Sequence, residues 1–432
     1  MSPNDNTEQP TGEPLGASAS DSARRVSRRH LLIGGAAAGA GAVAAVGIGA
    51  ATGSLSSQSD SDNTGSPKNS KEYESAAKLF GEGTVSPYGK HQAGIVEPNP
   101  LQANIRYAAY DLLPSTDRNA IKRMLRVVTG DIERLTEGRG ALADSEPELA
   151  EIPANLTITV GFGAELVRRV NPNLVPDWLA PLPAFTRDQL DASYSGGDLM
   201  LNIQADDPLT VAHAHRMLMR DLASFASIRW VQSGFRRAAG AEPAGTTMRN
   251  MMGQVDGTVN PDPEVDEFDG LVWETAKAGW LAGGSAFVLR RIDMLLDTWD
   301  KVARSAREET IGRDLPVGAP LTGTKETDPA DFEAVNSLGL PVIPDFAHIR
   351  RARSTDPNER ILRRGVNFED NGKAGLLFAC YQVNPLTQFV PIQQRLDELD
   401  LLNQWIVHVG SAVFAIPPGF KKGGFVGETL FG

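Results

Sequence analysis

The chain has 432 residues and a formal net charge of −12 at pH 7, with 41% hydrophobic and 22% charged residues. This balance is typical of a soluble globular protein long enough for two domains, and the negative charge argues against nucleic acids or anionic membrane surfaces as partners. The single cysteine, Cys380, excludes an intramolecular disulfide, a covalent CxxCH haem site and any multi-cysteine zinc or iron–sulfur site.

The N-terminal region predicts an export signal followed by a linker. Residues 1–26 are polar, which indicates disorder. Arg28 and Arg29 then precede a Gly- and Ala-rich apolar run, a pattern typical of a twin-arginine signal. We therefore assign 1–51 to a disordered N-region with this signal and 52–84 to a flexible linker. The protein is expected in the periplasm, in the cell envelope or secreted, and an uncleaved signal would tether it to the membrane.

Regular structure is first predicted by an alternating pattern at 104–110, which favours a strand. The following helix is expected to begin after Asp117, because a Ser-Thr-Asp sequence precedes apolar residues at helical spacing. These apolar residues are Ile121, Met124, Leu125 and Val128. Alternation over 156–160 predicts a second strand. The folded part thus begins with a strand–helix–strand unit.

A faint internal repeat organises the rest of the folded part. Residues 199–204 predict a strand that leads into a helix capped by Asp207. Residues 376–382 lead in the same way into a helix capped by Asn384. In both places a proline follows the cap, which suits the first helical position.

A second pair of elements strengthens this repeat. The strand predicted at 285–291 and the helix predicted at 294–299 echo the first strand and helix of the chain. The chain therefore resembles two copies of one unit joined near residue 245. We predict an α+β fold with two ferredoxin-like halves, 85–245 and 246–432, whose sheets are antiparallel.

Few residues carry chemistry that can be identified from spacing alone. Asp256 stands in a Gly-Gln-Val-Asp-Gly-Thr stretch at 253–258, which fits either a surface turn or a platform where an acid beside a flat ligand shuttles a proton. The residues alone favour a loop or core role for His348. His213 and His215 are two positions apart on one predicted helix and make a poor ligand pair. HExxH and GxSxG motifs are absent from the sequence.

A series of short motifs follows in order along the second half. They are the GxxDG stretch, a Gly-Gly-Ser strand ending in two arginines, Leu-Thr-Gly, a histidine, Arg-Arg-Gly and two closing glycine-containing motifs, at 253–258, 283–291, 321–323, 348, 363–365, 375–378 and 417–419. With the N-terminal arginine pair, this series resembles the dye-decolorizing peroxidase family, and most closely its twin-arginine-exported deferrochelatase/peroxidase branch. The resemblance covers roughly residues 88–420.

The resemblance implies one non-covalent haem b in a pocket that lies mainly in the C-terminal half. It implies that His348 is the iron ligand, that Asp256 is the catalytic acid–base residue, and that Arg363 stabilises negative charge on peroxide oxygen. The residues that it implies for cofactor binding are Gly257, Thr258, Val259, His348, Arg353 and Arg363.

The implied function is a peroxidase that uses hydrogen peroxide to oxidise an organic electron donor. One alternative is a deferrochelatase, for which free haem is the substrate and intact porphyrin is left after iron release. Another alternative is a non-catalytic haem-binding protein of the envelope. The sequence leaves a homo-oligomer open.

Two features of this site stay open in the sequence. An iron-ligating histidine usually donates a hydrogen bond to a carboxylate. The segment 402–405 carries amides, which leaves Asp293 and Asp397 as candidates. Tyr381 and Trp405 are candidates for passing electrons from surface donors, and both equally fit a place in the core.

Overall fold

The computed structural model describes residues 81–243, 245–265 and 267–432. The predicted N-region and signal lie outside these ranges, as does the predicted linker apart from 81–84. The strands and helices of the described part are β1 Asn104–Leu112, α2 Arg118–Leu135, β2 Thr157–Phe162, α3 Ala164–Val170, β3 Leu199–Ala205, α4 Pro208–Leu222, β4 Ala226–Phe235, α5 Glu267–Val272, β5 Ser285–Met294, α6 Leu296–Trp299, α7 Arg304–Ile311, α8 His348–Ala352, β6 Leu362–Arg363, β7 Val366–Asp370, β8 Lys373–Gln382, α9 Phe389–Leu399 and β9 Ile406–Ile416.

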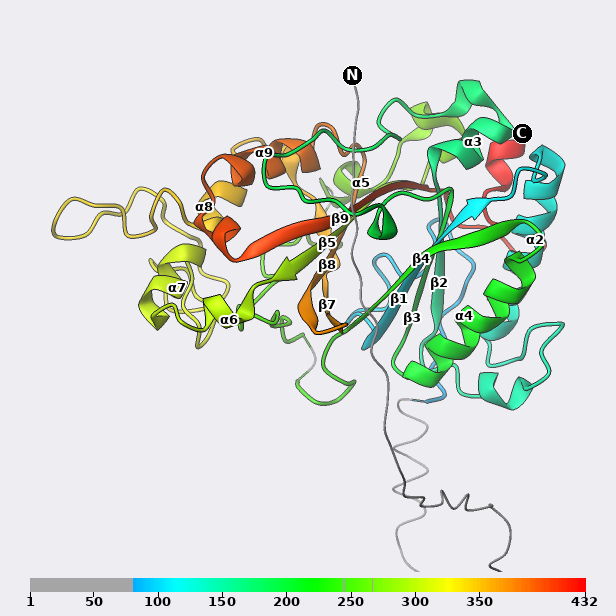
Figure 1. The fold of residues 1–432 in the computed structure, drawn as a ribbon, viewed down its shortest axis with the longest axis horizontal. Helices are drawn as coiled ribbons and strands as arrows, with labels where there is room; N and C mark the ends of the chain where they lie inside the picture. The colour runs from blue at the N-terminus through cyan, green and yellow to red at the C-terminus, as the bar shows by residue number, and fades with distance from the viewer. Residues whose placement is uncertain (1–80, 244, 266) are drawn as a thin grey trace, which may run out of the picture. The chain divides into compact units, whose positions relative to one another are not determined.

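The first half of the described chain forms an antiparallel sheet in the order β2-β3-β1-β4. Helices α2 and α4 pack against each other beside this sheet, on the right of Figure 1. The predicted start of α2 is confirmed, because the Asp117 side chain accepts a hydrogen bond of 2.8 Å from the backbone N–H of Ala120. The predicted apolar stripe of this helix is buried in the core.

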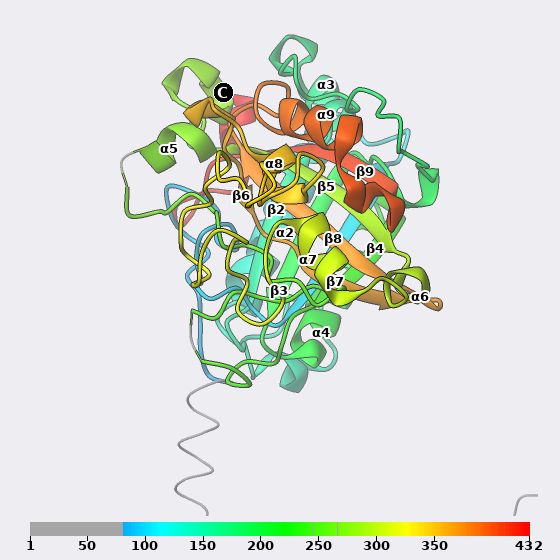
Figure 2. The ribbon, with the colours of Figure 1, turned by 90° about the vertical axis from the view of Figure 1, so that its left-hand side faces the viewer.

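The second half repeats this arrangement with the order β9-β5-β8-β7, and the short strand β6 pairs with β8. Helices α8 and α9 lie in front of these strands in Figure 2. Phe389 and Val390 of α9 share a hydrophobic cluster with Val288 of β5 and Cys380 of β8. Helix α9 therefore packs against the sheet of the second half.

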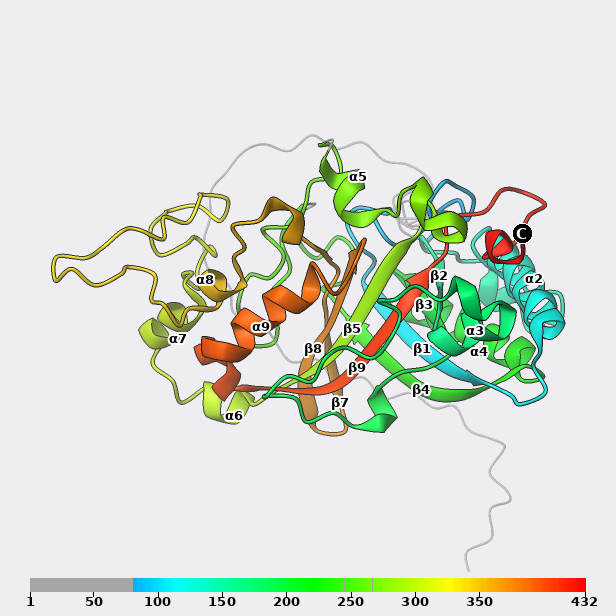
Figure 3. The same cartoon turned by 90° about the horizontal axis from the view of Figure 1, so that it is seen from above.

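The two sheets meet at both edges and form a closed ring of strands. β2 pairs with β9 at Phe162 and Ala415, and β4 pairs with β7 at Phe235 and Asn367. Pairing of β5 with β8 completes the ring. Figure 3 shows α2, α3 and α4 at one end of the strands and α6 to α9 at the other. The predicted fold class, two ferredoxin-like halves with antiparallel sheets, is confirmed.

Large apolar side chains from both halves form one core between the sheets. This cluster includes Tyr107, Trp230, Phe287, Tyr381 and Phe414. Because strands of both halves contribute to it, neither sheet buries this face by itself. The boundary near residue 245 stays a prediction. Within the described ranges, no helix has the length and apolar character needed to cross a membrane.

One predicted helix start is wrong. Asn384 does not cap α9, which begins at Phe389. The Asn384 side chain instead accepts a bond from the backbone N–H of Leu386, which forms a turn. Gln388 then donates to the carbonyl oxygens of Leu271 and Arg360 and holds this turn in place of a first helical turn. The sequence repeat is therefore less regular than the structural repeat.

Candidate active site

A cavity of about 670 Å³ lies in the second half of the chain, and all its lining residues fall between Asn250 and His408. Its walls are largely apolar, with side chains from β5, β8 and α9, and its size suits a bulky organic ligand. The lining includes every residue predicted for the site, namely Asp256, Gly257, Thr258, Val259, His348, Arg353 and Arg363. The fold thus brings together residues that are about a hundred positions apart in the sequence.

Asp256 and Arg363 form the polar pair of this cavity. The Arg363 Nη1 atom lies 3.8 Å from the Asp256 Oδ1 atom, and the side chains are 27% and 28% exposed. This partial exposure leaves both groups accessible from the cavity. The backbone N–H of Asp256 donates to the carbonyl oxygen of Met248 at 2.8 Å. Asn250 Nδ2 donates to Asp256 Oδ2 at 3.4 Å.

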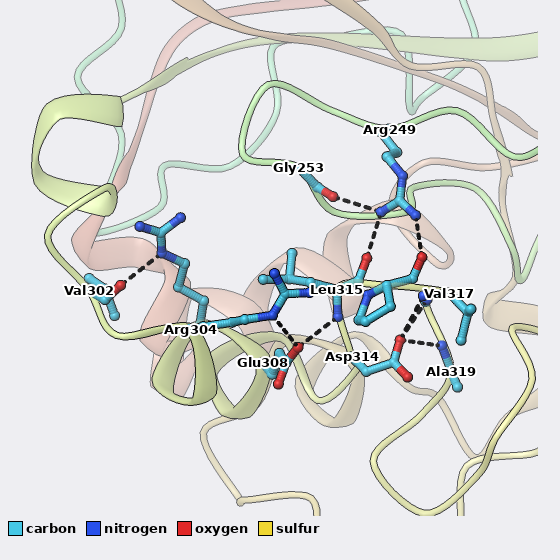
Figure 4. Close-up of polar contacts among 12 residues, drawn as sticks. Arg249, Gly253, Val302, Arg304, Glu308, Asp314, Leu315, Val317 and Ala319 are labelled. Carbon is cyan, nitrogen blue, oxygen red and sulfur yellow. Dashed lines mark hydrogen bonds and ion pairs between the residues drawn. The ribbon is translucent and has the colours of Figure 1, made fainter.

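The loop that carries Asp256 is a small hairpin. Arg249 and Val255 form an isolated antiparallel bridge at its tip. Gly257 follows Asp256 with a φ of 131°, a conformation that favours glycine. Figure 4 shows how the Arg249 guanidinium holds the tip, because it donates to the carbonyl oxygens of Gly253 and Leu315. The acid therefore stands on a braced turn.

Asn260 ties the end of this loop to the strand that carries Arg363. Its Nδ2 atom donates to the Arg363 carbonyl oxygen at 2.9 Å, and its Oδ1 atom accepts from the Arg363 N–H at 3.0 Å. These reciprocal bonds imitate one rung of a β-ladder. Asn260 thus links the loop that carries Asp256 to the strand that carries Arg363, a contact that the sequence analysis did not predict.

His348 is the first residue of α8, and its ring is held by a buried carboxylate. The Nδ1 atom lies 2.6 Å from Asp400 Oδ2, while 33% of the histidine side chain stays exposed. Removal from water lowers the pKa of His348, but the charge and hydrogen bond of Asp400 outweigh this effect, so the pKa is raised. Because Nδ1 is engaged, Nε2 is the nitrogen left to bind a ligand in the cavity.

The prediction that Asp293 or Asp397 is the partner of this histidine is wrong. Asp293 accepts a bond of 2.7 Å from Lys373, and Asp397 accepts bonds from backbone N–H groups of 186–187. Asp400 also caps the short 3₁₀ turn that follows it, through the N–H of residue 402. An aspartate in this N-cap position, just before the amide-bearing segment, is the sequence signal that could have identified it.

Three further arginines that line the cavity are Arg313, Arg353 and Arg360. The Arg353 guanidinium lies 4.7 Å from the centre of the Phe332 ring, which fixes its direction. Fixed guanidinium groups beside an apolar cavity suit a flat ligand with peripheral carboxylates.

The predicted electron-relay residues differ in position. Tyr381 is fully buried, and its hydroxyl oxygen accepts a bond of 3.2 Å from Asn202, so it is not a surface residue. Trp405 is half-buried, and its ring lies edge-on to Trp299 with centroids 5.2 Å apart. Of these two residues, Trp405 is the one that keeps access to solvent.

Comparison with known proteins identifies the relatives of this chain. The Dyp-type peroxidase N-terminal model matches residues 92–236, and the Dyp-type peroxidase C-terminal model matches residues 247–421. The chain belongs to the Dyp-type peroxidase family. Membership confirms the prediction of an enzyme of the haem peroxidase type.

Several Dyp-type relatives match over most of their length. The dye-decolorizing peroxidase of Thermobifida fusca is 38% identical over 386 residues, which cover 84% of this chain and 88% of that protein. The deferrochelatase of Escherichia coli K12 is 32% identical over 375 residues, covering 78% and 87%. The crystal structure of a DyP-type peroxidase from Cellulomonas bogoriensis matches with a TM-score of 0.78 at 51% identity, covering 81% and 99%. The family therefore includes two activities that this site must be tested for.

Proposed function

We propose that this protein is a peroxidase with one non-covalent haem b, in which His348 is the iron ligand, Asp256 the acid–base residue and Arg363 the charge stabiliser. The observation that supports this proposal is the meeting of these three residues in one cavity. The Asp256–Arg363 pair is 3.8 Å apart, and the His348–Asp400 pair is 2.6 Å apart. A histidine held by a carboxylate and a separate acid–arginine pair suit the two sides of one cofactor.

The residues present fit a haem. Neutral imidazole is a common iron ligand, and the engaged Nδ1 of His348 leaves Nε2 for the metal. Apolar side chains would contact the porphyrin, and Arg353 and Arg360 would pair with its propionates. The only cysteine, Cys380, is fully buried in β8, which favours a cofactor held without covalent bonds.

The chemistry of the side chains follows from their types and positions. A bound haem would supply the redox chemistry that reduces peroxide. Asp256 accepts the proton of one peroxide oxygen and returns it to the other, so that this oxygen leaves as water. Arg363 is always charged, and it stabilises the negative charge that develops on the leaving oxygen. Overall, one hydrogen peroxide and two protons accept two electrons from organic donors and yield two water molecules.

A second candidate function is the release of iron from haem. It is favoured by the match to a deferrochelatase at 32% identity. In that reaction haem is the substrate, and the cavity need only hold it and let iron leave. Haem incubation followed by chromatography separates the two functions, because iron release yields intact protoporphyrin and peroxidase turnover does not.

We also propose export by the twin-arginine route to the periplasm, the cell envelope or the medium. The support is the pair Arg28-Arg29 before an apolar Gly/Ala run. Replacement of both arginines by lysine should hold the full chain in the cytoplasm, as followed by cell fractionation. An unchanged distribution would refute the route.

Peroxide turnover by the purified haem-loaded protein tests the main proposal. We expect oxidation of an organic dye that requires both haem and hydrogen peroxide. Haem binding without any peroxide turnover would instead support the non-catalytic alternative, because a carrier needs only an axial ligand and a pocket.

A further inference from the structure

Glu326, in the loop between α7 and α8, contacts both ends of the hairpin that carries Asp256. Its Oε1 atom accepts bonds from Thr247 Oγ1 at 2.6 Å and from Thr258 Oγ1 at 2.8 Å. The two threonines lie on opposite sides of Asp256 in the sequence. We propose that Glu326 is a positioning residue that closes the base of this hairpin and so fixes the acid–base group, an inference that rests on the proposed role of Asp256.

The two branches of the hairpin lie close together where Glu326 joins them. Asp256 N–H donates to the Met248 carbonyl oxygen at 2.8 Å, so the branches are bonded next to the threonines. A Cβ atom at Gly257 would lie 3.4 Å from the methyl group of Thr247. Movement of the Thr247 branch is therefore transmitted directly to the residues beside the acid.

Glu326 is itself held from behind. Arg313 is 7% exposed, and its Nη1 atom donates to the carbonyl oxygens of Gly318 at 2.6 Å and Glu326 at 2.8 Å. At the opposite end of the hairpin, Arg249 donates to the carbonyl oxygen of Leu315, as Figure 4 shows, and to that of Pro316. The segment 313–326 thus holds both the base and the tip of the hairpin.

The contacts define what a substitution removes. Glu326→Ala removes the acceptor for both hydroxyl groups, whereas Glu326→Gln keeps an Oε1 acceptor at the same place. A loosened hairpin lets Asp256 move relative to Arg363 and peroxide, and a misplacement of about 1 Å can cost roughly 10²-fold in rate. The expected phenotype is therefore a loss that glutamine rescues.

The first test compares three variants in the haem-loaded enzyme, with rates expressed per bound haem. Glu326→Ala should lower kcat/KM for peroxide by about 10–100-fold, and Glu326→Gln should stay within about threefold of the parent protein. KM for the organic donor should not change, because Asp256 acts on peroxide. Glu333→Ala is the matched control, since Glu333 is exposed on the same loop. A normal peroxide rate in Glu326→Ala, or an equal loss in Glu326→Gln, would overturn the inference.

A double-substitution cycle tests whether Glu326 acts through Asp256. If it does, Glu326→Ala should lower kcat/KM for peroxide little further in an Asp256→Asn background, because the effects of substitutions at residues that act as a unit are not additive. Fully additive losses would refute the coupling. The double variant Thr247→Val, Thr258→Val keeps the glutamate and removes both hydroxyl donors. Its peroxide rate per bound haem should fall as far as that expected for Glu326→Ala, and it replaces the alanine variant if that one folds poorly.

Hydrogen exchange gives a measurement that does not depend on turnover. In the purified protein, Glu326→Ala should speed exchange of the Asp256 amide, which donates to Met248, and Glu326→Gln should not. If Asp256→Asn keeps full activity, the proposed acid–base role fails while this test of positioning still stands. Unchanged exchange in Glu326→Ala would refute positioning alone.

Discussion

At the scale of single residues, one cavity contains a carboxylate beside an arginine and a histidine that is held by a second carboxylate. The Asp256 and Arg363 side chains are close enough to act on one peroxide molecule, and both are accessible from the cavity. The family resemblance implied these three residues, whereas their spacing alone did not assign their roles. The N-cap position of Asp400 is a local sequence signal, but its pairing with His348, 52 residues earlier in the chain, depends on the packing of α9 and the following turn against α8.

Replacement of the acid should slow peroxide chemistry without loss of the cofactor. Asp256→Asn keeps the shape of the side chain but removes the proton acceptor, so the rate of reaction with peroxide should fall about 10²–10⁴-fold. Stopped-flow absorbance at several peroxide concentrations measures this rate. Asp262→Asn, at an exposed position nearby, is the control. An unchanged rate in the Asp256 variant would assign the main role to Arg363.

The carboxylate behind the histidine should control affinity for the cofactor. Asp400→Asn keeps a hydrogen-bond acceptor near Nδ1 but removes the negative charge that makes the imidazole basic. We expect haem affinity to fall about 10–100-fold. Competitive haem transfer to an apoprotein acceptor measures it, with the exposed Asp297→Asn as the reference. Equal affinities in the two variants would show that the charge has no such effect.

At the scale of elements, the sequence predicts those strands and helices whose formation depends on neighbouring residues. Alternation and the Asp117 cap identified the first strands and α2, because those signals act within a few residues. The predicted start of α9 was wrong, because Gln388 donates hydrogen bonds to distant backbone carbonyl groups and the expected first helical turn does not form. Closure of the ring depends on single pairs such as Phe162 with Ala415, and these carry no local signal.

The link between the acid loop and β6 makes a prediction at this scale. Asn260→Ala removes both bonds that join the loop to the Arg363 backbone. The distance between the acid and the arginine should then vary, and kcat/KM for peroxide should fall about 10-fold or more. Steady-state kinetics per bound haem measures the loss. Activity equal to that of the parent protein would show that packing alone aligns the two elements.

At the scale of the whole molecule, the two halves share one ring, but only the second half lines the cavity. The first half completes the shared core, and it contributes Asp188 to a buried ion pair with Arg290 of β5. Stability of either half is therefore expected to depend on the other. The fold class was predictable because the repeat is visible as a sequence pattern. The joining of the two sheets was not, because it depends on contacts between residues far apart in the chain.

Buried histidines should make the whole fold sensitive to acid. Burial, and then the charge of Arg290, lower the pKa of His408 from 6.5 to about 3. His408 is therefore protonated near pH 6.5 in the unfolded chain but only near pH 3 in the folded protein. Stability from this group is full above pH 6.5, and it falls by about 1.4 kcal/mol per pH unit below that value. The free energy of unfolding, measured with denaturant between pH 6 and 4, should depend less steeply on pH in His408→Gln than in the parent protein. Equal slopes for the two proteins would contradict a role of His408 in this pH dependence.

We propose that His348 binds the iron of a haem in the cavity beside Asp256 and Arg363. Haem titration into apoprotein, followed by the Soret band, tests it most directly. The parent protein and His91→Gln should each bind one haem with the same spectrum. His348→Ala should lose the band or show it shifted and far weaker. Unchanged affinity and an unchanged spectrum in His348→Ala would contradict the proposed role of His348 as the iron ligand.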